Sequence, residues 1–143
     1  MELIGFSISK DCIGLERGPD RFDLHNNFDF QGLSYSPINR TLELLWHRGT
    51  GDWVKATEPS SLRLDFSGVY LLKAQERDPE LPFSEDDCLD TIGFLWDDML
   101  AEMRGYTSNE PKEGCSHLII RFMGGFSIKV GAQSAALHVA GSA

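Results

Sequence analysis

Cysteine, runs of basic residues and long hydrophobic runs are all scarce in this sequence, and each scarcity excludes a class of protein. The three cysteines, Cys12, Cys88 and Cys115, are too few and too widely spaced for a disulfide framework or for paired CxxC zinc ligands. The longest apolar runs, such as residues 69–72, are far shorter than the roughly 18 residues of a membrane span. Without clustered Lys or Arg, the chain lacks the phosphate contacts of a nucleic-acid binder. We therefore expect a soluble cytoplasmic protein with neither a membrane nor a nucleic acid as its partner.

Sequence motifs of catalysis and nucleotide binding are also missing. No GxGxxG or Walker loop opens a helix, and the four histidines stand singly in strand-like segments. Cys115 and His117 are close in sequence, but no third group is spaced to orient the pair for nucleophilic catalysis. The sequence thus predicts no catalytic residue, no metal ligand and no cofactor.

Acidic residues are abundant in one stretch, residues 76–102, which holds ten Asp or Glu against the single basic residue Arg77. Its charge of −9 equals that of the whole chain, because residues 1–75 carry −2 and residues 103–143 carry +2. The acidity is therefore local, and a local field can select a partner of opposite charge.

The length and the hydrophobic pattern predict one domain spanning residues 1–143. A chain of this size buries roughly two-thirds of its unfolded surface on folding, which suffices for a core of its own. Apolar and polar residues alternate from end to end, as in half-buried strands, and short Gly- and Pro-containing turns separate the runs. Connections this short favour antiparallel neighbours. The predicted core comprises Ile4, Phe6, Leu42, Leu44, Leu62, Leu64, Phe66, Leu118, Ile120, Phe122, Phe126, Ile128 and Val130.

Residues 118–130 form the clearest hairpin in the sequence. Two alternating segments flank Gly124-Gly125, and a three-residue loop, 123–125, sets Phe122 opposite Phe126 and Ile120 opposite Ile128. A two-residue loop would instead mix the apolar face of one segment with the polar face of the other. We therefore predict the three-residue loop, with a glycine in the left-handed region.

Residues 85–104 are predicted to form the main helix. Ser84 precedes an acidic first turn, Gly105 follows the last residue, and the apolar side chains fall on one face at helical spacing. Phe94 projects into the acidic face, and Gly93 weakens the helix by about 1 kcal/mol relative to alanine. The alternative is a strand through Ile92, Phe94 and Trp96, followed by a short helix over 97–104.

The predicted fold class is accordingly α+β, with a mostly antiparallel sheet that is curved or forms two layers and one main helix near 85–104 packed on it. An all-β sandwich is the alternative. On the helix, five residues form a candidate surface for binding a basic protein, with an aromatic anchor between the acidic residues: Asp86, Asp90, Phe94, Asp97 and Asp98. The oligomeric state stays open.

Two other side-chain groups suggest different ligands. The carboxylates of Glu85, Asp86, Asp87 and Asp90 resemble a Ca²⁺ or Mg²⁺ site, yet the alternating ligands and central glycine of an EF-hand loop are absent. Trp46 or Trp53 could stack on a sugar or a base, although tryptophan at a strand end usually serves packing.

Two segments resemble a known group of proteins. The pattern Leu62-x-Leu64-x-Phe66-x-Gly68-Val69 and the pattern Phe122-x-Gly124-Gly125-x-x-Ile128-x-Val130-x-Ala132 are similar to small β-rich bacterial proteins of unknown function, some of them grouped with immunity proteins of polymorphic toxin systems. The resemblance implies a non-enzymatic bacterial protein. We therefore expect a protein-binding or immunity-type inhibitor module that uses an acidic surface. A small-ligand or metal-binding domain and an enzyme of unidentified class are the alternatives.

Overall fold

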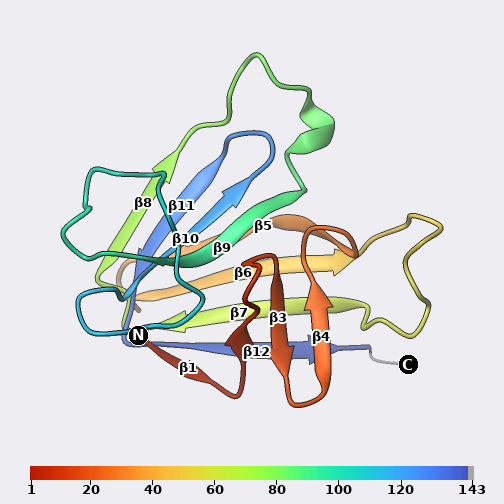
Figure 1. The fold of residues 1–143 in the computed structure, drawn as a ribbon, viewed down its shortest axis with the longest axis horizontal. Helices are drawn as coiled ribbons and strands as arrows, with labels where there is room; N and C mark the ends of the chain where they lie inside the picture. The colour runs from red at the N-terminus through yellow and green to blue at the C-terminus, as the bar shows by residue number, and fades with distance from the viewer. Residues whose placement is uncertain (142–143) are drawn as a thin grey trace.

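The computed structural model describes residues 1–141, which form twelve strands and one short 3₁₀ helix (Figure 1). The strands build three sheets of five, four and three strands, in the orders β1-β12-β7-β6-β5, β8-β11-β10-β9 and β2-β3-β4. All neighbouring strands pair antiparallel except β1 and β12, which run parallel. The elements are β1 (Glu2–Ile4), β2 (Ser7–Ile8), β3 (Gly14–Arg17), β4 (Asp20–Asp23), β5 (Phe28–Ser36), β6 (Thr41–Arg48), β7 (Ser61–Ser67), β8 (Leu71–Gln75), η1 (Phe83–Glu85), β9 (Leu89–Leu95), β10 (His117–Phe122), β11 (Ser127–Gly131) and β12 (Ser134–Ala140).

One hydrophobic core joins the three sheets. The alternating apolar side chains of β6 and β7 face those of β9, β10 and β11, and the small sheet adds Ile8, Leu15 and Phe22 to the same cluster. In Figure 1 the strands of the four-stranded sheet run obliquely to those of the five-stranded sheet. In the same view, β3 and β4 of the small sheet run across β7 and β12. Successive side chains of a strand point to opposite faces of its sheet, so the apolar face of each sheet is buried only where it packs against another sheet.

Most of the predicted core is buried. Ile4 is an exception, with 49% of its surface exposed, because β1 lies at the edge of the five-stranded sheet. Phe6 and Phe126 are only partly buried against the core. The remaining predicted core residues are buried.

The predicted hairpin register is confirmed. Leu118 pairs with Val130 and Ile120 with Ile128, while the Phe122 amide donates to the Phe126 carbonyl at 2.9 Å. The loop spans residues 123–125, and Gly125 has a φ of +93°, a conformation that a glycine adopts without strain.

The predicted main helix over 85–104 is wrong. Residues Leu89–Leu95 form β9, whose pairing with β10 sets Ile92 opposite Ile120 and Phe94 opposite Leu118. The only helical segment among residues 1–141 is the three-residue η1. The all-β alternative therefore describes the fold better than α+β, and the antiparallel sheets are as predicted. The strand alternative for 92–96 was correct in kind, but no helix follows it over 97–104.

The sequence of β9 resembles that of a helix because both faces of the strand are buried. Ile92 and Phe94 face the main core, and Leu95 forms a second buried cluster with Met103 and Ile119 on the outer face of the four-stranded sheet. Burial on both faces removes the period-two alternation by which strands are recognised. Gly93 is required here, because a Cβ at this position would lie 2.7 Å from the Cβ of Thr107.

Residues 96–116 make the cover on that outer face. The Phe94 and Ser108 backbones exchange hydrogen bonds of 2.7 and 2.9 Å, which ties the cover to the edge of β9. The fully buried Lys129 of β11 donates from Nζ to the carbonyls of Met99, Leu100 and Glu102. The cover thus replaces the predicted helix as the element packed on this sheet.

Candidate functional site

The connection between β8 and β9, residues 76–88, is the most acidic part of the surface, and we call it the acidic loop. Arg77 holds it in shape. Its Nε donates to both carboxylate oxygens of Asp86 at 3.0 and 2.9 Å, and its Nη atoms donate to the carbonyls of Asp78 and Leu81 at 3.0 and 2.8 Å. Each bond to the guanidinium is charge-assisted, so the loop is ordered although it contains little regular structure.

Phe83 stands out at the tip of the acidic loop. Its ring is 80% exposed and lies under the Arg77 guanidinium, 4.4 Å from the ring centroid. The same loop carries four exposed carboxylates: Glu76, Asp78, Glu80 and Asp87. The sequence analysis missed this aromatic residue, although a Phe directly after Pro82 in a segment with many carboxylates was a visible sign of an exposed aromatic.

The negative field of the loop reaches the neighbouring strand β5. Burial raises the pKa of Asp29, and the adjacent charge of Asp87 raises it further. The amide of Phe30 donates to the carbonyl of Asp87 at 2.9 Å, which fixes the loop against β5. The carboxylates on this side are therefore not fully neutralised by the one arginine.

An apolar pocket of about 630 Å³ lies on the β5 side of the acidic loop. Phe30 and Phe126 form its aromatic walls together with Pro79, and Glu76, Arg77 and Asp86 stand at its rim. Phe122 stacks between the two rings, with centroids 4.3 Å from Phe30 and 6.0 Å from Phe126. The pocket can accept an apolar or cationic side chain within reach of carboxylates.

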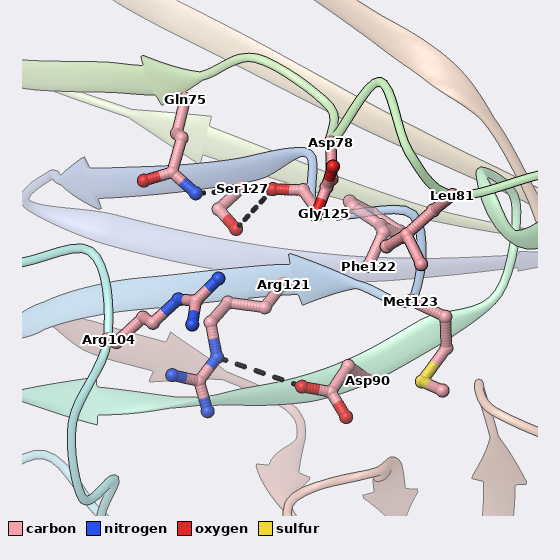
Figure 2. Close-up of a pocket in the computed structure, with 10 residues that line it drawn as sticks. All are labelled: Gln75, Asp78, Leu81, Asp90, Arg104, Arg121, Phe122, Met123, Gly125 and Ser127. Atoms are coloured by element: carbon pink, nitrogen blue, oxygen red, sulfur yellow. Dashed lines mark hydrogen bonds and ion pairs between the residues drawn. The ribbon is translucent and has the colours of Figure 1, made fainter.

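A second cavity, of about 380 Å³, lies on the other side of the acidic loop, against the outer face of the four-stranded sheet (Figure 2). We call it the arginine cleft. Its walls come from the sheet, the hairpin tip, the acidic loop and the cover: Gln75, Asp78, Leu81, Asp90, Arg104, Arg121, Phe122, Met123, Gly125 and Ser127. Figure 2 shows the guanidinium groups of Arg104 and Arg121 at one side, with Asp78 well away from Arg104. The sequence analysis assigned no role to either arginine, because only folding brings position 104 of the cover near position 121 of β10.

The five predicted partner-binding residues do not form one surface. Phe94 is completely buried in the main core, so it cannot be the aromatic anchor. Asp86 pairs with Arg77, Asp90 lies 3.9 Å from the Nε of Arg121, and Asp98 is exposed. Asp97 lies in the cover, where it accepts hydrogen bonds from the amide and hydroxyl of Ser116 at 2.8 and 2.9 Å. Burial opposes its ionisation, but these bonds outweigh burial and lower its pKa.

A cysteine and a histidine far apart in sequence meet next to the acidic loop. The Sγ of Cys88 lies 3.5 Å from the Nδ1 of His25, and the same Nδ1 lies 2.5 Å from the carbonyl of Leu89. At that distance Nδ1 must carry a proton and donate it to the carbonyl, so it cannot accept the thiol proton. Burial raises the pKa of the Cys88 thiol, and the nearby carboxylates of Glu85 and Asp87 raise it further. The pair lacks the activated thiolate of a cysteine nucleophile.

The other residues considered from sequence lie in different surroundings. Cys115 is buried with a raised pKa due to burial, and burial lowers the pKa of His117. Trp46 is fully buried in the core, whereas Trp53 is exposed and donates from Nε1 to the Asn26 carbonyl at 2.7 Å. Among residues 1–141, no three His, Cys, Asp or Glu side chains converge as metal ligands, and Glu85, Asp86, Asp87 and Asp90 are no exception.

Comparison with known proteins gives no relative: no family model, no curated protein and no solved structure matches this chain. Within residues 1–141, no helix has the length and apolar character needed to cross a membrane.

Proposed function

We propose that this protein is a protein-binding module, of the inhibitor or immunity type, whose acidic loop receives a basic partner protein. The observation that carries the proposal is the exposed Phe83 on an ordered loop rich in carboxylates. Exposed aromatic residues are the commonest energetic anchors of interfaces, and surrounding charges accelerate association with a partner of opposite sign. This surface takes the place of the helical surface expected from the sequence.

The ordering of the acidic loop supports the proposal energetically. Because Arg77 already fixes the backbone and the ring of Phe83, a partner would not have to order the loop on binding. The apolar pocket walled by Phe30 and Phe126 lies beside it and suits a lysine or arginine of the partner, with its stem on the rings and its charge near Glu76.

A non-enzymatic role in a reducing, cytoplasmic compartment fits the cysteines. All three are free thiols, and Cys12 and Cys115 are buried where oxidation would not reach them. The sequence resemblance to small β-rich bacterial proteins, some of them grouped with immunity proteins, supports the same type of role.

The experiment begins with the isolation of a partner from an extract of the source cells, followed by its identification, purification and titration by calorimetry. The test variant combines Glu80→Lys with Phe83→Ala. Its matched control combines Asp52→Lys with Tyr106→Ala, which makes the same charge change and removes an exposed aromatic residue elsewhere. Neither pair touches the core, so both variants should fold.

We expect a partner with a basic surface, an affinity that falls roughly tenfold to a hundredfold in the test variant, and no change in the control. Association of the wild-type protein should slow as salt is raised, because exposed charges are screened beyond about 8–10 Å. A purified partner with an acidic surface, or equal affinity for both variants, would refute the proposal.

A further inference from the structure

Basic residues gather on the outer face of the four-stranded sheet, which is unexpected in a chain of net charge −9. Lys73, Lys129 and Arg121 project from β8, β11 and β10, and Arg104 of the cover joins them. Lys129 is fully buried beneath the cover, where burial lowers its pKa and the charge of Lys73 lowers it further. Several basic side chains of this face thus lie close to the acidic loop.

Arg121 contributes a donor without an acceptor. Its Nε is buried and forms no hydrogen bond within residues 1–141, and the nearest carboxylate oxygen, on Asp90, is 3.9 Å away. That distance is too long for a hydrogen bond. A buried charged donor left without a partner costs about 1–3 kcal/mol or more, so an acceptor entering the arginine cleft would recover this free energy.

Arg104 also lacks an acceptor. It is exposed, lines the same cleft, and has no hydrogen bond or ion pair with any residue the structure describes. Two guanidinium groups at one side of a cavity repel each other and match the two oxygens of a carboxylate. Figure 2 draws both among the residues that line the cleft, Arg121 from β10 and Arg104 from the cover.

Two carboxylates also line the cleft: Asp90 lies 3.9 Å from the Nε of Arg121, and Asp78 belongs to the acidic loop. Asp78 lines it from the acidic loop, and only its Oδ1 is engaged, accepting the Glu80 amide at 2.9 Å. Asp78 and Asp90 would repel a dianion such as phosphate, but one of them can pair with an ammonium group. Between the two charged sides, Gln75 and Ser127 donate to the Gly125 carbonyl over 3.4 and 3.3 Å, bonds long enough to be exchanged for better ones.

We propose that the arginine cleft binds a small zwitterion of the amino-acid type. Its carboxylate lies between Arg121 and Arg104, its ammonium group pairs with Asp78, and its side chain packs on Phe122 and Leu81. A volume of about 380 Å³ is near the lower end of ligand pockets and suits a molecule of this size. The inference does not depend on the proposed protein partner, because it concerns the opposite side of the acidic loop.

The probes are the proteinogenic L-amino acids, each added at millimolar concentration. Binding is detected by NMR of the backbone amides of the full chain. For the best binder, two derivatives separate the contacts: the N-acetyl form lacks the ammonium group, and the amide form lacks the carboxylate. Inorganic phosphate is tested in parallel. The variants are Arg104→Gln and Asp78→Asn, both at exposed positions, with Arg17→Gln on β3 as the matched control.

We expect at least one amino acid to shift the amide signals of Arg121, Gly125 and Ser127, and both derivatives to bind at least tenfold more weakly. Arg104→Gln and Asp78→Asn should each weaken binding by a similar factor, and Arg17→Gln should not. The proposal is overturned if no amino acid binds, if phosphate binds more tightly than any amino acid, if the N-acetyl form binds as well as its parent, or if the control variant weakens binding equally.

Discussion

Replacement of Lys129 by methionine should release the cover from the outer face of the four-stranded sheet. Lys129 is completely buried, and its ammonium group donates to the carbonyls of Met99, Leu100 and Glu102. Methionine keeps the length and apolar character of the stem but removes all three donors. The substitution therefore tests whether the ammonium group, rather than the packing of the side chain, holds residues 97–104 in place.

The expected loss of unfolding free energy is about 2–4 kcal/mol. Hydrogen bonds to charged groups contribute about 1.5–3 kcal/mol each, which would exceed this figure for three bonds. Two effects reduce it: the carbonyls regain water when the cover opens, and the variant no longer buries a charge. The control is Lys73→Met, since the exposed Nζ of Lys73 donates to Leu100 and Ala101 at 3.3 Å and should contribute less than about 1 kcal/mol.

Urea denaturation measures the free energy, and amide hydrogen exchange locates the change. The Asp97 amide, which donates to the Gly114 carbonyl at 2.8 Å, should lose protection in Lys129→Met, while the Ile120 amide at the centre of the sheet should lose no more than global stability requires. Equal stability of the two lysine variants, or an unchanged exchange rate at Asp97, would refute the idea that the Lys129 ammonium group holds the cover in place.

The contribution of Lys129 should also depend on pH. Burial and Lys73 hold its pKa below the usual lysine value, so between the lowered pKa and about 10.4 the unfolded chain binds more protons than the folded chain. The free energy of unfolding should therefore rise with pH across that window in the wild-type protein relative to Lys129→Met. A difference that falls with pH there would contradict the assigned direction.

Three further predictions concern the core, the hairpin and the free thiols. Ile120→Ala should lower the unfolding free energy by about 2–5 kcal/mol, since Ile120 is fully buried, whereas Ile38→Ala at a 94% exposed position should leave the urea midpoint unchanged. Gly125→Ala should be more destabilising than Gly18→Ala in the same assay, because both have positive φ but only a Cβ at 125 would lie 2.8 Å from a backbone atom, the Asp78 amide nitrogen. In the native state Cys88 should be the first of the three cysteines to react with iodoacetamide, because the other two are buried. At neutral pH it should still react more slowly than a free thiol, because burial raises its pKa. Mass spectrometry after timed quenching measures the rate, and a Cys88 that reacts as fast as free cysteine would contradict the prediction.

Local chemistry explains which parts of the fold could be predicted. The hairpin over 118–130 was predictable in register because the alternation on its two strands matched only with a three-residue loop, and because a slip of one residue would turn the apolar set of one strand away from the main core. The strands through Leu44 and Leu64 were predictable for the same reason, since each has one buried and one exposed face. Where one face of a strand packs on the core and the other faces water, the alternation in the sequence is sufficient to predict the strand and its buried side.

The candidate sites were far less predictable. The sequence did locate the acidic segment, and part of it is the acidic loop, but it assigned the aromatic anchor to the buried Phe94 rather than to Phe83. A solvent-exposed side chain leaves no periodic pattern. The arginine cleft was not foreseen at all, because Arg104, Arg121 and Asp78 come from three separate segments of the chain.

The sequence by itself therefore determined the register of the 118–130 hairpin, most of the main core and the position of the local charge, because alternation and charge are patterns of residues close together in the chain. Tertiary structure alone decided the state of residues 89–95. Their side chains suit an amphipathic helix and a strand buried on both faces equally well, and the choice depends on distant partners, β10 on one edge and the cover on the outer face. Contacts between segments that are remote in sequence decided between these two states, and contacts of the same kind built the acidic loop and the arginine cleft.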